Sequence, residues 1–184
     1  MSTIGAWIKA ARPRTLPLSL SGIFVGLGLT VEHGNMAPMA VIGCIVTTIC
    51  FQVLSNFAND LGDGMKGTDN AARIGPMRAV QSGEISIQQM KMGVIVLGIL
   101  SVLSAGVVIY SAPAIQSGNG IIFYAVLALL CVFAAITYTV GKKAYGYHGL
   151  GDLMVFLFFG VVAVSGTKHL FDEQFVLNEL LGAI

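Results

Sequence analysis

Charged side chains are scarce in this sequence of 184 residues. Asp, Glu, Lys and Arg together make up 10% of it, whereas soluble domains carry about 25%. Hydrophobic residues make up 55%, and they fall in long runs. Most of the surface is therefore not built to face water, which excludes an ordinary soluble domain. Basic residues are also too few and too scattered to form a nucleic-acid-binding surface.

Cysteine is equally sparse and shows no pattern. Cys44, Cys50 and Cys131 lie inside apolar runs without CxxC or Cys–His spacing, so neither a zinc site nor a disulfide framework is predicted. Free cysteine commonly behaves as a small hydrophobic residue. The basic N-terminus leads into an apolar segment without a small-residue cleavage signal, so we expect a retained first span and not a signal peptide.

The apolar runs themselves have the length of membrane spans. A bilayer core about 30 Å thick needs about 20 apolar residues in a helix. Five segments approach or meet this length, at residues 16–31, 36–58, 92–112, 120–140 and 150–166, and a weaker stretch at 175–184 resembles the start of a sixth. The sequence therefore predicts an all-α, multi-pass transmembrane helical bundle, a single domain over residues 1–184 with five full helices and a partial sixth.

The distribution of Lys and Arg predicts the orientation of the spans, because these residues concentrate in short cytoplasmic loops. Of the ten, Lys168 falls on one side of the predicted bundle and the other nine fall on the opposite side. These nine are Lys9, Arg12, Arg14, Lys66, Arg73, Arg78, Lys91, Lys142 and Lys143. We therefore expect the N-terminus and both long polar loops to lie in the cytoplasm.

The loop after the second span combines acidic, amide and basic side chains, in the order NFANDLGDGMKGTDNAARIGPMRAVQSG. If the span continues as a helix, four polar residues share one face: Asn56, Asn59, Asp60 and Asp63. Carboxylate and amide oxygens suit Mg²⁺, which substrate phosphate oxygens typically complete. Lys66, Arg73 and Arg78 follow, and an arginine fork pairs bidentately with phosphate. The segment predicts a Mg²⁺–diphosphate site; the alternative is a solvated loop with incidental charges.

A second polar loop, after the fourth span, carries further candidates. Tyr138 and Lys142 are four residues apart at the end of that span, and Asp152 enters the first turn of the fifth. Carboxylates at a membrane boundary are costly and suggest a function. A carboxylate is also favoured at any helix N-terminus, and Lys142 could be an ordinary cytoplasmic anchor, so both interpretations stay open.

Three stretches, which follow one another along the chain as they do in the family, resemble the UbiA-type intramembrane aromatic prenyltransferases. NDLGDGMKGTD, from Asn59, is similar to the first Asp-rich motif of the family. ARPRTLPLSLSGIFVGLGL, from Ala11, resembles its opening helix, and YTVGKKAYGYHGLGDLMVFLFFGVVAVSGT, from Tyr138, resembles its YxxxK region. The motif is usually NDxxDxxxD. Here Asp69 follows Asp63 by six residues instead of four, which is typical of the menaquinone branch, the 1,4-dihydroxy-2-naphthoate polyprenyltransferases.

The resemblance makes Asn59 and Asp63 the clearest Mg²⁺ ligands. Asp60 and Asp69 are further metal candidates, and Asn56 supports them. For catalysis we single out Lys142, Tyr138 and Asp152; for binding the diphosphate we single out Lys66, Arg73, Arg78 and Arg12. The implied reaction is the Mg²⁺-dependent transfer of a polyprenyl group from polyprenyl diphosphate to 1,4-dihydroxy-2-naphthoate. Loss of CO₂ gives demethylmenaquinone, in the bilayer of a bacterial plasma membrane.

The resemblance also implies a longer protein. Family members have about nine transmembrane helices and a second Asp-rich motif, whereas this sequence stops within a sixth predicted span. We therefore expect an incomplete chain or one that has lost activity, and little prenyl transfer by the 184 residues alone.

Other functions remain possible. Another UbiA-type aromatic prenyltransferase would share the same motifs. A CDP-alcohol phosphotransferase also uses an Asp cluster and Mg²⁺, but its signature has two residues between Asp-Gly and Ala-Arg, and here seven separate Asp63-Gly64 from Ala72-Arg73. A transporter or channel subunit could place acidic residues on an ion path, although this cluster lies at the end of a span.

Overall fold

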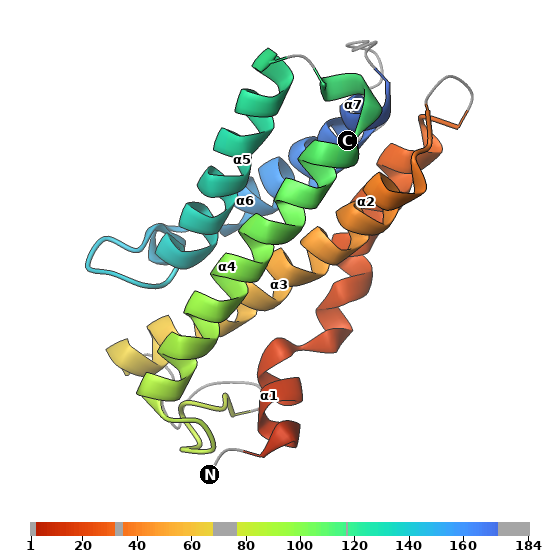
Figure 1. Ribbon diagram of the computed structural model, residues 1–184. Coiled ribbons are helices and arrows are strands. Elements are labelled where there is room, and N and C mark those ends of the chain that lie inside the picture. Colours follow the sequence, from red (N-terminus) through yellow and green to blue (C-terminus); the bar gives the residue numbers. More distant parts are fainter. Residues whose placement is uncertain (1–2, 32–34, 68–76, 117, 173–184) are drawn as a thin grey trace.

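The fold is a bundle of helices running side by side (Figure 1). The computed structural model describes residues 3–31, 35–67, 77–116 and 118–172, and these contain no β-strand. The principal helices are α2 (Leu16–Gly28), α3 (Pro38–Lys66), α4 (Ile87–Ser111), α5 (Gly118–Thr137), and a continuous stretch formed by α6 (Gly151–Val155), the π-helix η4 (Phe156–Gly166) and α7 (Thr167–Phe171). Short elements flank them: α1 (Ile4–Ala11), η1 (Pro13–Thr15), η2 (Pro113–Ile115) and η3 (Tyr145–His148).

Four of the five predicted spans are confirmed as helices long and apolar enough to cross a membrane. These are α3, α4, α5 and the stretch Gly151–Phe171. The first predicted span is shorter than expected, since α2 has 13 residues. The predicted partial span at 175–184 lies outside the described residues. The all-α, multi-pass membrane bundle is therefore confirmed, with a first helix that differs in length.

The N-terminal segment is divided into separate helices because the chain breaks at Arg12. This residue has a φ of 51°, a left-handed conformation that is uncommon for any residue except glycine. It precedes Pro13, which disfavours the α-helical region for the residue before it. The break separates α1 from α2 and places Arg12 between them.

Helix α3 continues beyond the expected membrane boundary at Ala58, as the one-face prediction requires. It ends at Gly67, whose φ of 65° provides a left-handed cap, and the Gly67 amide donates to the carbonyl of Asp63. The next long helix, α4, begins with a reciprocal capping box between Ser86 and Gln89. These two caps define the ends of the loop that carries the basic candidates.

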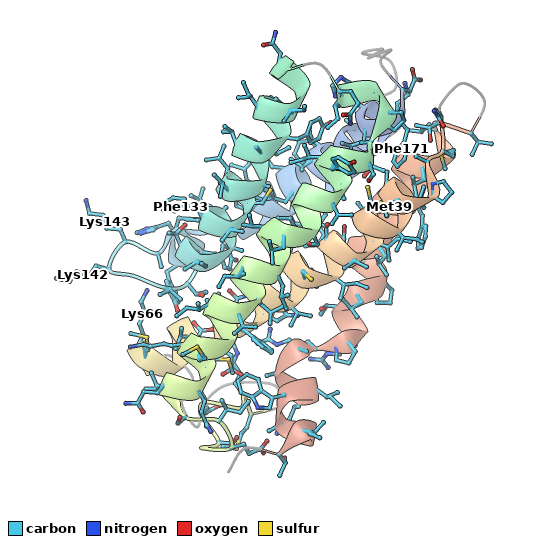
Figure 2. All side chains as sticks on the ribbon, viewed as in Figure 1. Met39, Lys66, Phe133, Lys142, Lys143 and Phe171 are labelled. Atoms are coloured by element: carbon cyan, nitrogen blue, oxygen red, sulfur yellow. The ribbon has the colours of Figure 1, made fainter. Side chains whose placement is uncertain are left out.

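Two apolar cores stabilise the bundle at opposite ends. One gathers α1, the last turns of α3 and the start of α4 around Leu54, Phe57 and Met90. The other gathers α2, the start of α3 and α7 around Leu27 and Phe171. Lys66, Lys142 and Lys143 lie toward one end of the bundle, whereas Met39 and Phe171 lie toward the other (Figure 2). The polar loops predicted to face the cytoplasm thus share one end.

Helix α2 packs very closely against η4. A Cβ atom added to Gly22 would lie 2.6 Å from the carbonyl oxygen of Phe159, and one added to Gly26 would lie 2.6 Å from that of Val164. Small residues allow this approach between membrane helices, where packing drives association. The Gly22-x-x-x-Gly26 spacing is therefore a helix-packing seam.

Replacing Gly26 with alanine should destabilise the bundle by about 1–3 kcal/mol, because the added methyl group must displace backbone. Gly106→Ala is the matched control, since a Cβ at Gly106 meets nothing within 4 Å and alanine is the better helix former. Unfolding of the detergent-solubilised protein by denaturant would measure both. Equal stabilities for the two variants would contradict the close seam.

Candidate functional site

The candidate site lies on the last turns of α3, where the predicted polar face turns into the bundle. Asn56, Asp60 and Asp63 are buried, with 4%, 1% and 8% of their surfaces exposed. Asn59 is partly buried and lines a cavity described below. The structure therefore brings these four candidates together along one helix, as predicted.

Asp60 holds the loop that leads into α4. Its two carboxylate oxygens accept hydrogen bonds from the backbone amides of Ala79 and Val80, each at 3.1 Å. Both oxygens are thus engaged by the protein itself. Asp60 therefore has a structural role, which the sequence did not predict. This role is separate from the metal-binding role that the sequence predicted for it.

Asp63 joins three separate segments of the chain. One carboxylate oxygen accepts from the Arg78 guanidinium and the other from the Tyr147 hydroxyl. Arg78 also donates to the carbonyl oxygen of Asn59 at 2.8 Å. The amide oxygen of Asn59 in turn accepts from the Thr139 hydroxyl at 3.1 Å. The end of α3 is therefore linked to the loops on both sides of it.

Burial and several charged neighbours act on the Arg78 guanidinium. Burial and, to a smaller extent, the nearby Arg12 guanidinium lower the pKa of Arg78 to about 10, with Asp60 and Tyr147 acting in the opposite direction. A pKa of about 10 leaves Arg78 charged at neutral pH. Two guanidinium groups that repel each other at close range would be stabilised by a bound diphosphate.

Asn56 fixes the broken N-terminal segment to α3. Its amide donates to the Ala11 carbonyl at 2.8 Å and to the Thr15 hydroxyl at 3.2 Å. Gln52 donates to the same hydroxyl at 3.0 Å and accepts from Ser19. Asn56 therefore holds the chain on both sides of Arg12 against α3; its supporting role at a metal site stays a prediction.

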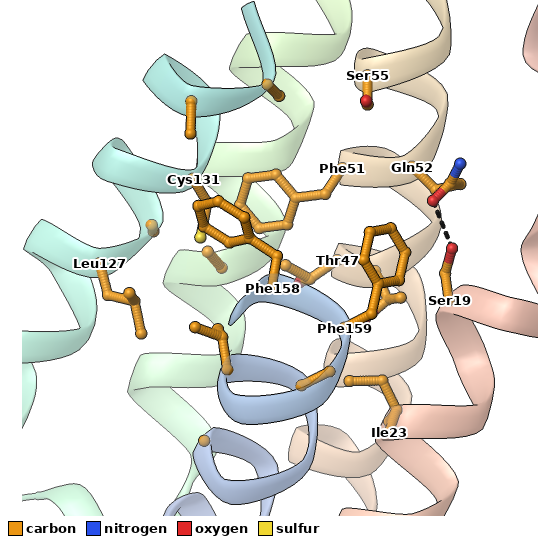
Figure 3. A pocket seen from close by; sticks show the side chains of 18 of the residues that line it. Ser19, Ile23, Thr47, Phe51, Gln52, Ser55, Leu127, Cys131, Phe158 and Phe159 are labelled. Atoms are coloured by element: carbon orange, nitrogen blue, oxygen red, sulfur yellow. Dashed lines mark hydrogen bonds between the residues drawn. The ribbon is translucent and has the colours of Figure 1, made fainter. Parts of the chain in front are cut away.

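An apolar cavity of about 450 Å³ extends from this site into the bundle. All of the principal helices contribute to its walls. The rings of Phe51, Phe158 and Phe159 project into it from α3 and η4 (Figure 3). Asn59 and Tyr138 lie at one end, and Tyr124 and Leu170 line the part toward the other. The cavity thus joins a polar end to a long apolar interior.

Of the three candidates from the second loop, one lines the cavity and two are exposed. Tyr138 lines the cavity and packs edge-on against Tyr145. Lys142 is exposed and projects away from the bundle (Figure 2). Gly141, with a φ of 106°, turns the chain before Lys142, so the four-residue spacing does not place the two side chains on one helical face. Asp152 lies in the first turn of α6, as predicted, and is exposed.

Of the three remaining charged candidates in the first loop, the structure describes one. Lys66 lies on the last turn of α3, with its ammonium 3.9 Å from the centre of the Tyr147 ring. Asp69 and Arg73 lie outside the described residues. Sequence reasoning missed Thr139 and Tyr147, which contact the site from a turn-rich loop where no periodic pattern indicates direction.

The side chains on α3 fit a Mg²⁺ ion. Asn59 and Asp63 are one helical turn apart and offer an amide and a carboxylate oxygen, hard ligands of the kind that Mg²⁺ combines with water and phosphate oxygens. Within the described ranges no three His, Cys, Asp or Glu side chains gather as a metal site. A metal here would thus depend on ligands beyond the carboxylates of these ranges, such as the Asn59 amide and substrate oxygens.

Comparison with known proteins identifies the family of the chain. The UbiA prenyltransferase family matches residues 19–173. The chain is 44% identical to the 1,4-dihydroxy-2-naphthoate octaprenyltransferase of Haemophilus influenzae over 97% of the chain and 58% of that protein. It is 41% identical to the protein of the same name from Escherichia coli over 92% of the chain and 54% of the relative.

The chain therefore spans somewhat more than half the length of these curated relatives. A more distant relative, UbiA prenyltransferase domain-containing protein 1 of Homo sapiens, is 25% identical over 86% of the chain and 45% of its own length. No solved structure gives a significant match.

Proposed function

Because the chain belongs to the UbiA prenyltransferase family, we propose that it serves the transfer of a polyprenyl group from polyprenyl diphosphate to 1,4-dihydroxy-2-naphthoate. Decarboxylation of the acceptor would give demethylmenaquinol, the reduced form of demethylmenaquinone, in menaquinone biosynthesis. The observation that carries the proposal is the junction of two environments. Asn59 lines the apolar cavity and its carbonyl accepts from Arg78, which pairs with Asp63, so a charged cluster meets an apolar cavity, as a lipid diphosphate requires.

Each end of the donor would meet suitable chemistry. Arg78 and Arg12 would bind diphosphate oxygens, and Lys66 adds a third cation at the end of α3. Asn59 and Asp63 would hold Mg²⁺, which when bound would neutralise the diphosphate and stabilise its departure. The isoprenoid chain would lie in the cavity, whose wall beside the site bears aromatic rings.

The cavity would also protect the reacting carbon. The allylic C–O bond breaks, and its electron pair leaves with the diphosphate. The acceptor ring carbon that bears the carboxylate then forms the new C–C bond, and loss of CO₂ restores the aromatic ring. Walls formed by Phe51, Phe158 and Phe159 would exclude water and present π faces to the cation. Lys142 and Asp152 remain catalytic candidates that lie outside this wall.

The proposed location follows from the same polarity. We place the charged end, with the N-terminus, at the cytoplasmic face of a bacterial plasma membrane, where a soluble naphthoate would arrive. Most Lys and Arg residues are predicted on this side. Protease accessibility of the loop at residues 77–86 in sealed inverted vesicles would test the orientation.

Metal removal tests the proposed donor site. The detergent-solubilised chain should bind labelled geranylgeranyl diphosphate with Mg²⁺ present, and EDTA should weaken this binding at least about tenfold, because the ion supplies several kcal/mol of charge stabilisation. Excess CDP-diacylglycerol should not compete. Formation of demethylmenaquinol, detected as the quinone after oxidation in air, would test the transfer step once the naphthoate is added. Binding that survives EDTA, or equal binding of the CDP lipid, would contradict the proposal.

A further inference from the structure

We propose that Tyr147 is a positioning residue for Asp63, fixing the carboxylate in the orientation in which it holds a divalent cation. This inference rests on the proposed function, because it names a second residue of the same site. Tyr147 lies in η3, on the loop between α5 and α6. Neither the sequence nor the similarity to relatives indicated it.

The two oxygens of Asp63 have different partners. Tyr147 donates its hydroxyl proton to one oxygen, and Arg78 donates an N–H to the other. A carboxylate has about four lone-pair positions, so an oxygen that accepts a proton from a tyrosine can in general also bind a cation. With both oxygens held, rotation of the carboxylate is restricted, so the direction from which it can bind a cation is fixed.

The Tyr147 ring is held by contacts with the same helix end. The Lys66 ammonium lies 3.9 Å from the ring centre, a distance typical of a cation–π contact. Lys66 and Asp63 are three residues apart on α3, so one side chain touches neighbouring positions of a single helical face. Tyr147 remains 44% exposed, so these contacts, more than burial, determine its position.

A hydrogen bond from Tyr147 to Asp63 would strengthen metal binding by the carboxylate. Carboxylates that bind metals are usually hydrogen-bonded by a second group, and loss of that group typically lowers metal affinity about 10–100-fold. A neutral phenol suits the task because it orients the carboxylate without neutralising it, as a second arginine would. The loop that bears Tyr147 also bears Tyr138 and Tyr145, which line the cavity. One loop therefore contacts the proposed metal ligand, Asp63, and also forms part of the cavity wall.

The test is the affinity of the detergent-solubilised chain for Mn²⁺, a spectroscopic substitute for Mg²⁺, measured by the EPR signal of the free ion. Tyr147→Phe removes the hydroxyl and keeps the ring beside Lys66. We expect its Kd for Mn²⁺ to rise about 10–100-fold. Tyr110→Phe, at a residue 82% exposed on α4, is the matched control and should leave the Kd unchanged. Asp63→Ala should abolish this binding.

Hydrogen exchange along residues 138–150 separates positioning from simple support of the loop. A raised Kd with unchanged amide protection supports the inference. A raised Kd with lost protection, an unchanged Kd, or tighter binding would overturn it, the last because Tyr147 would then compete with the ion. If Asp63→Ala binds Mn²⁺ like the unmodified chain, the metal site itself fails, and the proposed function fails with it. If Asp63→Ala alone loses binding, the proposed function stands and only the part given to Tyr147 fails.

Discussion

Replacing Asp63 with alanine is expected to lower the Mg²⁺-dependent affinity for polyprenyl diphosphate by at least about 100-fold. The change removes a proposed metal ligand together with the group that orders Arg78 and Tyr147. Breaking a buried charge pair by removing one partner costs about 3–5 kcal/mol. Without Asp63, the Arg78 guanidinium would also lose the contact that orients it. Equilibrium binding of labelled geranylgeranyl diphosphate, with and without Mg²⁺, measures the loss.

Two further variants make this result specific. Asp63→Asn keeps an oxygen that can accept from Tyr147 but removes the negative charge, so its Mg²⁺-dependent binding should fall nearly as far. Glu84→Ala removes a carboxylate whose exposed ion pair with Lys9 is worth little, and it should bind the donor normally. Unchanged donor binding by Asp63→Ala would exclude the carboxylate as a ligand and remove the main support for the metal site.

Asp60→Ala should disorder the loop before α4 and destabilise the protein. The variant leaves the buried amide of Ala79 and the neighbouring amide of Val80 without their acceptor. An unsatisfied buried donor costs about 1–3 kcal/mol, so the two together should lower the free energy of unfolding by about 2–6 kcal/mol. Hydrogen exchange at residues 78–86 and thermal unfolding in detergent would detect the change.

Asp60→Ala and Asp60→Asn together distinguish the two roles considered for Asp60, loop anchor and metal ligand. If Asp60 is mainly a loop anchor, Asp60→Asn should retain part of the protection, since its amide oxygen can still accept one of the two hydrogen bonds. If Asp60 is mainly a metal ligand, Asp60→Ala should lose Mn²⁺ affinity while the loop keeps its protection. That second outcome would contradict the anchoring task described here.

Long apolar runs made most of the fold predictable. Helices of 20 or more residues appear where the hydrophobic segments predicted them, because lipid requires every backbone group in a span to be satisfied internally. The division of the N-terminal segment into α1 and α2 was harder to predict, because it depends on the conformation of one residue. Arg12 adopts a left-handed φ that the Asn56–Ala11 hydrogen bond helps to hold, and no local pattern indicates such a contact across 45 residues.

The candidate site was predicted where helical periodicity governs it. Asn56, Asn59, Asp60 and Asp63 belong to one helix, so their spacing fixed their common face in advance. The partners of these residues come from loops, and loop geometry is set by hydrogen bonds that are distant in sequence. For this reason, Tyr147 and the backbone amide at Val80 could not be anticipated, and the spacing of Tyr138 and Lys142 suggested a shared face that the turn at Gly141 prevents.

The brevity of α2 has a consequence for how the chain enters a bilayer. Its 13 residues rise about 20 Å, about 10 Å less than the thickness of the hydrocarbon core. Lipid beside α2 must therefore thin, or the segment containing Thr15 must sink into the hydrocarbon. In either case the hydroxyl of Thr15 meets the Gln52 amide and escapes contact with acyl chains. The chain just before α2 thus has a polar partner on α3 within the bundle.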